Sequence, residues 1–125
     1  MSKIMIVGAS RGIGLELTKQ YAEAGDQVIA CARDTSEAQK LDSLAEGSAN
    51  IVIKELDIGD PKSIESAKSE IGDGIVDTLI IVAGTTGGQH QSLDDLDIEE
   101  WHTALNINTI GPALVARAFK ANLVA

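Results

Sequence analysis

Apolar side chains gather in four short runs along the chain, at residues 3–8, 27–32, 51–56 and 76–84. The runs contain many Ile and Val residues, and the first and last end in glycine, which is typical of buried β-strands. The fourth run is apolar on both faces. We therefore expect four strands, each at least partly covered by other elements.

Between these runs, apolar residues recur at helical spacing. Ile13, Leu17 and Tyr21 follow one another every four residues until Gly25, which predicts a first helix with these side chains on its buried face. A second helix is expected over residues 36–45.

The third and fourth predicted helices carry start patterns. Asp60 followed by Pro61 is typical of an N-cap acid and a proline in the first helical position. Asp97 and Glu100 have the spacing of a capping box at the start of a long final helix. The apolar positions expected on that last helix are Trp101, Leu105, Ile110, Leu114 and Phe119.

Strands that alternate with helices in this way predict βαβ units with right-handed crossovers and a parallel sheet. We expect one α/β domain over residues 1–125, a doubly wound, Rossmann-like sheet in the strand order 3-2-1-4 with helices on both faces. This arrangement is the first half of such a fold plus one strand of its second half, truncated before a fifth strand.

Composition narrows the partners and the location. The formal net charge of −9 disfavours nucleic acid, whose phosphates select basic surfaces. No apolar run reaches the roughly 20 residues of a membrane span, and the N-terminus leads directly into a strand. These features predict a soluble, unexported protein of the cytoplasm that binds neither nucleic acid nor membranes.

The residues that could bind a metal are few. Cys31 is the only cysteine, so one copy forms no disulfide and no cysteine-based metal centre. His90 and His102 lie twelve residues apart, which matches no common ligand spacing. We expect no metal site.

A glycine-rich segment joins the first strand to the first helix. Gly8, Gly12 and Gly14 have the order G-x-x-x-G-x-G. Glycines let the backbone turn tightly and approach a ligand closely, and the helix that follows directs its free N–H groups at the same space. A pyrophosphate is the natural occupant, and the alternative is a tight strand-to-helix turn without a ligand.

The segment "GASRGIG" resembles the cofactor loop of the short-chain dehydrogenase/reductase family. The resemblance implies an NAD(P) cofactor held by Gly8, Ser10, Arg11, Gly12, Ile13 and Gly14. Asp57 in "ELDIGD" resembles the family's acid that hydrogen-bonds the adenine amino group, with Ile58 packed beside the base. In isolation, an ordinary turn acid is an equal alternative for Asp57.

Two later segments extend the resemblance. "VAG", at Val82, Ala83 and Gly84, resembles the end of the family's N-N-A-G motif at the cofactor. Asn108 in "NINTIGP" resembles the catalytic asparagine that kinks its helix and helps hold a proton-relay water, although an ordinary helical asparagine is an alternative. The stretch "SLDDLDIEEWHTALNINTIGPALVARAF" further resembles the C-factor-like branch of the family.

The end of the second strand bears on the choice of cofactor. An acid there accepts hydrogen bonds from a ribose 2′-hydroxyl, whereas an arginine pairs with a 2′-phosphate. Ala32 stands where the family has its discriminating acid, and Arg33 stands where it has its discriminating base. Arg11 adds a second positive charge. We predict NADP(H) rather than NAD(H), with Asp34 as the residue that favours the opposite choice.

Other residues depart from the family pattern. The only tyrosine is Tyr21, which is followed four positions later by Gly25 and cannot be the family's proton-donating Tyr-x-x-x-Lys tyrosine. The family's serine strand and Tyr-x-x-x-Lys helix would follow the last helix of this chain. Val7 replaces a threonine, and Ile81 and Val82 replace both asparagines of N-N-A-G, which predicts weakened cofactor binding.

Three hypotheses are consistent with these residues. The first is the cofactor-binding half of an NADP(H)-dependent oxidoreductase, which transfers hydride between nicotinamide and a carbonyl or alcohol. This half would be inactive alone. It would act on a small carbonyl or alcohol substrate only if other residues, from elsewhere, complete the site. The second is a non-catalytic NADP(H)-binding, signalling or interaction module, and the third a fold that binds nothing. In each case the fourth strand would lie at an open edge of the sheet, and the final helix would leave part of its apolar surface uncovered. Both features predict a homo-oligomer.

Overall fold

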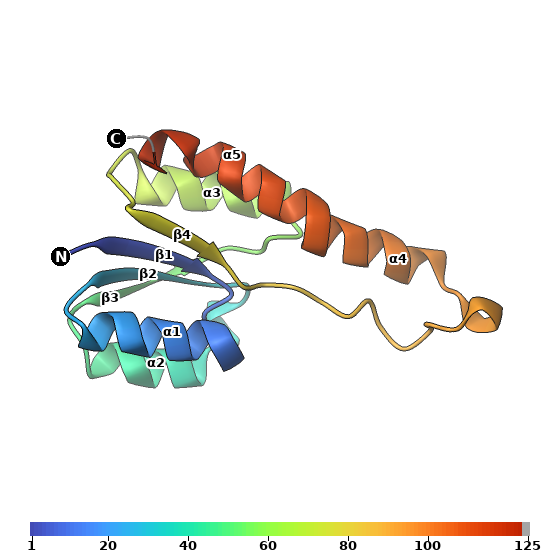
Figure 1. The fold of residues 1–125 in the computed structure, drawn as a ribbon, viewed down its shortest axis with the longest axis horizontal. Helices are drawn as coiled ribbons and strands as arrows, with labels where there is room; N and C mark the ends of the chain where they lie inside the picture. The colour runs from blue at the N-terminus through green and yellow to red at the C-terminus, as the bar shows by residue number, and fades with distance from the viewer. Residues whose placement is uncertain (124–125) are drawn as a thin grey trace.

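The computed structural model describes residues 1–123, and its centre is one parallel four-stranded sheet (Figure 1). The strands are β1 (Lys3–Val7), β2 (Gln27–Ala32), β3 (Ile51–Glu55) and β4 (Thr78–Ile81). Their order is β3-β2-β1-β4, with Ile6 of β1 paired to Ala30 of β2 and Ile80 of β4. The predicted α/β class and strand order are confirmed.

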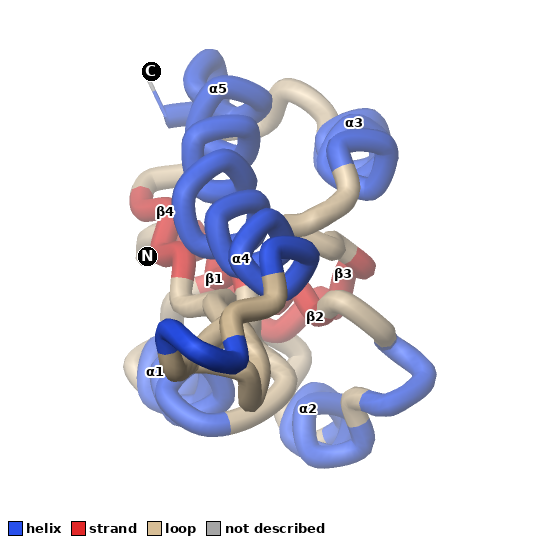
Figure 2. Tube along the Cα trace, turned by 90° about the vertical axis from the view of Figure 1, so that its right-hand side faces the viewer, coloured by secondary structure: helices blue, strands red, loops and turns tan. Residues whose placement is uncertain are grey.

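The helices form a layer on each face of the sheet (Figure 2). One layer contains α1 (Gly12–Glu23) and α2 (Gln39–Glu46), and the other contains α3 (Pro61–Ile71) and α5 (Gly111–Leu123). A further helix, α4 (Ile98–Leu105), extends beyond the sheet and runs into α5 through a π-helical segment at Asn106–Ile110 (Figure 1).

Strand β1 is buried on both faces, which explains its uninterrupted apolar sequence. Ile4 and Ile6 belong to the core beneath α1 and α2. Met5 and Val7 belong to the core beneath α3 and α5. Successive side chains of one strand therefore hold both helix layers to the sheet.

Strand β4 is shorter than the predicted run of residues 76–84. The backbone N–H groups of Val82 and Ala83 both donate to the Val7 carbonyl oxygen, at 2.8 and 3.1 Å. Because two consecutive N–H groups share one carbonyl oxygen, the regular hydrogen-bond pattern between β1 and β4 ends here, and the chain leaves the sheet after Ile81.

The buried face of α1 agrees with the predicted one in part. Leu17 and Tyr21 pack half-buried against the core, whereas Ile13 is 71% exposed. The fully buried positions, Gly14, Thr18 and Ala22, have the same spacing of four but begin one residue later. Small side chains let the helix lie close to the sheet, and the Thr18 hydroxyl donates to the Gly14 carbonyl oxygen within the helix.

The predicted start of α3 is confirmed. The Asp60 carboxylate accepts a hydrogen bond from the backbone N–H two residues later, at 3.1 Å, and Pro61 occupies the first helical position. The helix expected from residue 36 begins instead at Gln39, because Thr35–Glu37 forms a separate 3-10 turn capped by Asp34.

The start of α4 is predicted correctly, but its capping box is wrong. The Asp97 carboxylate accepts from the Glu99 N–H at 3.0 Å. Glu100 does not return to Asp97. Its carboxylate accepts from the His90 backbone N–H at 3.2 Å and contacts His90 Nδ1 at 3.0 Å, which ties the preceding loop to the helix.

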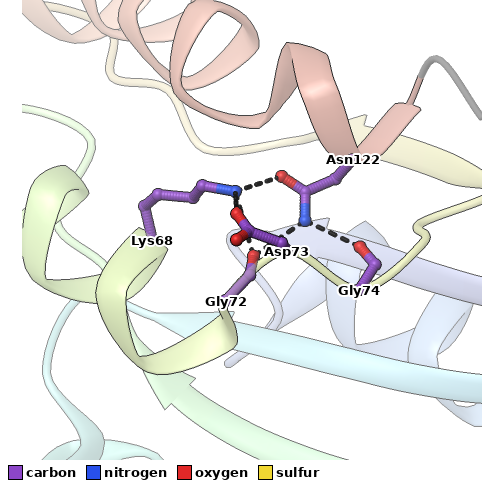
Figure 3. Close-up of polar contacts among 5 residues, drawn as sticks. All are labelled: Lys68, Gly72, Asp73, Gly74 and Asn122. Carbon is purple, nitrogen blue, oxygen red and sulfur yellow. Dashed lines mark hydrogen bonds and ion pairs between the residues drawn. The ribbon is translucent and has the colours of Figure 1, made fainter.

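A buried asparagine joins the end of α5 to the turn between α3 and β4 (Figure 3). Asn122 donates from Nδ2 to the carbonyl oxygens of Gly72 and Gly74, at 2.9 and 2.7 Å, and accepts from Lys68 Nζ at 2.6 Å. Lys68 also contacts the exposed Asp73 carboxylate. All side-chain polar groups of Asn122 are thus satisfied within the protein.

The apolar surface of α4 is largely uncovered, as predicted for the last helix. Trp101 and Leu105 are each 53% exposed, and Ile110 is half exposed. Leu114 is half-buried, while Phe119 near the far end of α5 is fully buried.

Among residues 1–123, the helices are all too short or too polar to cross a membrane.

Candidate functional site

Most residues singled out from the sequence follow the carboxyl ends of the strands, and Asn108 lies in the helical segment Asn106–Ile110. Because all four strands are parallel, these ends meet at one edge of the sheet, to which the arrowheads in Figure 1 point. Four connections lie there: residues 8–11 after β1, residues 33–34 after β2, residues 56–60 after β3 and residues 82–88 after β4. Ligands of open α/β sheets bind at this edge.

Gly8 brings the first of these connections against the fourth. Its φ is +95°, and a Cβ atom at this position would lie 2.6 Å from the Ala83 nitrogen. The N–H groups of Gly8 and Ala9 donate to the Cys31 carbonyl oxygen at 3.0 and 2.9 Å. Both φ and space therefore require glycine here.

Gly12 and Gly14 serve different purposes in the same loop. Gly12 has a φ of +56° with open space around it, so its requirement is conformational. A Cβ atom at Gly14 would overlap the Gly8 carbonyl oxygen, so its requirement is close packing. Within residues 1–123 no side chain caps the start of α1, and its first N–H groups stay available to an anion.

The cationic side chains near this edge are exposed. Arg11 lies at the start of α1 and Arg33 follows β2, and neither forms an ion pair within the described chain. The neighbouring Asp34 carboxylate is already engaged by the backbone N–H and the hydroxyl of Ser36. The Ser36 hydroxyl bond is the main cause that lowers the pKa of Asp34, and the adjacent Arg33 charge contributes least.

Asp57 organises the loop after β3. Its Oδ1 atom accepts from the Gly59 N–H at 2.9 Å, and its own N–H donates to the Ser63 hydroxyl at 2.8 Å. The Oδ2 atom has no hydrogen-bond partner among residues 1–123. Ile58 beside it is only 5% exposed, and its packing against the adenine base stays a prediction.

Asn108 holds the loop after β4. Its Oδ1 accepts from the Thr85 N–H at 2.8 Å and its Nδ2 donates to the Thr85 carbonyl oxygen at 2.7 Å. A Cβ atom at Gly84 would lie 3.2 Å from Asn108 Oδ1. The helix irregularity expected at Asn108 is present as the π-helical segment Asn106–Ile110.

Sequence reasoning missed Asn106 and Gly111. Asn106 Nδ2 donates to the Gly59 carbonyl oxygen at 2.8 Å. Gly111 is buried, and a Cβ atom there would lie 2.7 Å from Ile58 Cγ1. In a regular helix, residues two apart point in different directions, so Asn106 and Asn108 did not suggest a common purpose.

The three apolar departures from the family pattern have a packing explanation. Val7 is fully buried in the core beneath α3 and α5, and Ile81 packs against the same core. Val82 packs against the opposite core, beneath α1 and α2. Their side chains are occupied by the cores and offer no polar group at the edge.

Within residues 1–123, one group of three possible metal ligands comes together: His90, Asp97 and Glu100 have ligand atoms within 4.8 Å of one another. The hydrogen bond from His90 to Glu100 and the cap that Asp97 supplies to α4 account for this proximity. The His90 side-chain hydrogen bond lowers the pKa of Glu100, and Glu100 raises the pKa of His90. The expectation of no metal site stays a prediction.

The sequence model of the short chain dehydrogenase family matches residues 2–125. A short chain dehydrogenase of Aspergillus terreus is 34% identical over 121 residues, which cover 93% of this chain and 26% of that protein. An NADPH-dependent pterin aldehyde reductase of Arabidopsis thaliana is 28% identical over 118 residues, covering 93% of this chain and 48% of that protein.

The fold is similarly shared. The crystal structure of a carbonyl reductase from Pseudomonas aeruginosa in complex with NADP superimposes with a TM-score of 0.90 at 33% identity. The match covers 98% of this chain and 56% of the reductase. The chain thus spans between about a quarter and about half the length of these relatives.

Proposed function

Because this chain belongs to the short-chain dehydrogenase family, whose members bind a dinucleotide cofactor, we propose that it is the cofactor-binding part of an NADP(H)-dependent oxidoreductase. The reaction is hydride transfer between nicotinamide and a carbonyl or alcohol. The observation that carries the proposal is the glycine loop, closed against the end of β4 by Gly8 and left uncapped at the start of α1.

Each loop at the edge has a separate part in binding. The free N–H groups at the start of α1, with Gly12, Ile13 and Gly14, would hold the pyrophosphate. Asp57, with one carboxylate oxygen unpaired by residues 1–123, would accept a hydrogen bond from the adenine amino group. Gly84, which packs closely against Asn108, would lie beside the nicotinamide end.

The preference for NADP(H) rests on the charges after β2 and β1. Arg33 and Arg11 are exposed and free to pair with a 2′-phosphate. Asp34, the acid that could favour a 2′-hydroxyl, accepts two hydrogen bonds from Ser36 on one carboxylate oxygen, so it remains the residue that favours the opposite choice. An NADPH-dependent relative and an NADP-bound structural neighbour support the same choice.

Catalysis needs a proton donor beside the reacting oxygen. Tyr21 packs half-buried against the core beneath α1, so it does not reach the edge. Asn108 is the one residue of this chain that we assign to the reaction, through its hold on Thr85. We therefore expect cofactor binding with little turnover from these 125 residues alone.

Titration of the purified chain with NADPH and NADH tests the proposal. We expect NADPH to bind more tightly, and Arg33→Ala to weaken NADPH binding about tenfold while leaving NADH unchanged. Arg117→Ala, which removes an exposed arginine from α5, is the matched control. Equal affinity for the two cofactors that Arg33→Ala leaves unaltered would contradict the preference.

An assay of carbonyl reduction tests whether the catalytic site is complete. NADPH binding without turnover of a panel of aldehydes and ketones agrees with the cofactor-binding part of an enzyme and with a non-catalytic NADP(H) module. Turnover would show that the site is completed, for instance by a partner chain. Absence of binding to either cofactor would reject the proposal.

We also propose that the chain self-associates. Strand β4 pairs only with β1 among the described strands, so its outer edge carries unpaired backbone groups. Trp101 and Leu105 of α4 expose about half of their surface.

A further inference from the structure

One short segment contacts two of the four connections at the ligand edge. The π-helical segment Asn106–Ile110 carries Asn106, which donates to the Gly59 carbonyl oxygen, and Asn108, which bonds both backbone groups of Thr85. Residues 59 and 85 belong to loops that follow different strands, β3 and β4. The segment therefore bridges these two loops.

The two asparagine side chains leave the segment in different directions, which suits contacts with two separate loops. In a regular α-helix, side chains two residues apart point about 200° apart around the axis. Segments of π-helix are rare and are frequent at functional sites. Here both asparagine amides reach loops at the same edge of the sheet.

Contacts of the flanking residues keep the segment against the loop after β3. Gly111 packs so closely on Ile58 that no Cβ atom fits between them. Within the segment, Ile107 also packs on this loop, since a Cβ atom at Gly59 would lie 3.3 Å from Ile107 Cγ1. Movement of the Asp57–Gly59 turn must therefore be accompanied by movement of the helical segment.

We propose that Asn106 is a positioning residue that fixes the Asp57–Gly59 turn for the adenine of a dinucleotide and couples this turn, through Asn108, to Thr85 in the loop after β4. The Asp57 carboxylate and the Asn106 amide hold opposite polar groups of Gly59, its N–H and its carbonyl. Loss of the amide releases one of these two restraints. This inference rests on the proposed dinucleotide function.

The test compares Asn106→Ala and the isosteric Asn106→Asp with Asn50→Ala. Asn50 makes the same kind of bond, from Nδ2 to the Ala22 carbonyl oxygen at 3.2 Å, at the start of β3 and away from the ligand edge. Thermal unfolding identifies variants that remain folded. Asn106→Asp keeps the side-chain volume but removes the donor, so it replaces Asn106→Ala if the alanine variant does not fold.

The first measurement is hydrogen exchange without ligand. Both Asn106 variants should speed exchange of the Thr85 amide about fivefold, the loss expected for one hydrogen bond, and Asn50→Ala should leave it unchanged. Unchanged exchange at Thr85 in the Asn106 variants would overturn the coupling. This result does not depend on whether the chain binds a nucleotide.

The second measurement uses NADPH and 2′,5′-ADP, which lacks the nicotinamide end. The Asn106 variants should bind both about fivefold more weakly than the native chain and Asn50→Ala. At saturation, 2′,5′-ADP should protect the Thr85 amide in the native chain and not in the variants. Native affinity in the Asn106 variants would overturn the positioning. If the native chain binds neither ligand, the proposed function fails, and exchange at Thr85 alone decides the coupling.

Discussion

At Gly8 two constraints exclude a side chain, and they act on different parts of the molecule. The positive φ of +95° concerns the residue itself, while the approach of Ala83 concerns the neighbouring strand end. Gly25, at the end of α1, has a similar φ of +92° but open space around it. Comparing substitutions at Gly8 and Gly25 therefore separates the cost of backbone strain from the cost of a steric clash.

We expect Gly8→Ala to lower the free energy of unfolding by about 3 kcal/mol and Gly25→Ala by about 1 kcal/mol, because only the first adds a clash to the strain. Urea denaturation measures both. Only Gly8→Ala should also weaken NADPH binding. Equal losses of stability would mean that the loop after β4 moves aside at little cost.

A second prediction at this scale concerns His90. The hydrogen bond to Glu100 and its charge raise the pKa of His90 above its ordinary 6.5, and the same contact lowers the pKa of Glu100 below 4.5. The contact is fully present between these two ordinary values. It is lost as the pH rises through the raised pKa of His90 or falls through the lowered pKa of Glu100.

An NMR titration of the His90 ring should therefore give a midpoint above 6.5 in the native chain and a lower midpoint in Glu100→Gln. His90 is exposed and Glu100 is partly exposed, so we expect no measurable effect on global stability. An unchanged midpoint in Glu100→Gln would show that the loop does not hold this contact in solution.

At the scale of elements, the strands could be predicted better than the helices. Runs of Ile and Val with glycine ends identify buried strands directly, whereas the face of α1 had two candidate stripes one residue apart. Apolar content favoured Ile13, but contact with the sheet selected Gly14, because a small residue allows the closer approach. Such a choice depends on a neighbour that lies far away in the sequence.

The end of α5 supplies a prediction for the element scale. Asn122→Ala should lower the free energy of unfolding by about 3 kcal/mol, because it removes three hydrogen bonds and leaves the Gly74 carbonyl without its partner, while Lys68 Nζ keeps its bond to the Gly72 carbonyl. Asp73→Asn, which alters only the exposed member of the cluster, should change it by less than about 0.5 kcal/mol. Chemical denaturation of both variants measures the difference, and similar small losses would mean that water replaces the asparagine.

The candidate site could be predicted only in part from the sequence. The glycine loop, Arg33, Asp57 and Asn108 follow strand ends or a recognisable motif, so their meeting at one edge follows from the parallel sheet. The link from Asn106 to Gly59 spans 47 residues and starts from a π-helical segment. Hydrophobic periodicity carries no information about such a segment, because it is set by local backbone geometry and tertiary contact.

At the scale of the whole molecule, the open edge of β4 and the exposed face of α4 predict association. Sedimentation velocity at micromolar concentration should show dimers or larger species. Trp101→Lys should weaken association if α4 forms the contact, and should leave it unaltered if the β4 edge does. A strictly monomeric native chain would contradict the prediction.

The burial of Cys31 provides an internal chemical probe. Desolvation raises the pKa of this thiol to about 12, so the reactive thiolate is scarce in the folded chain, while the carbonyl oxygen of the same residue holds the amides of Gly8 and Ala9. An alkylating reagent therefore labels Cys31 only when this part of the sheet opens. The rate of labelling would report opening directly beneath the glycine loop, without any introduced dye or additional cysteine.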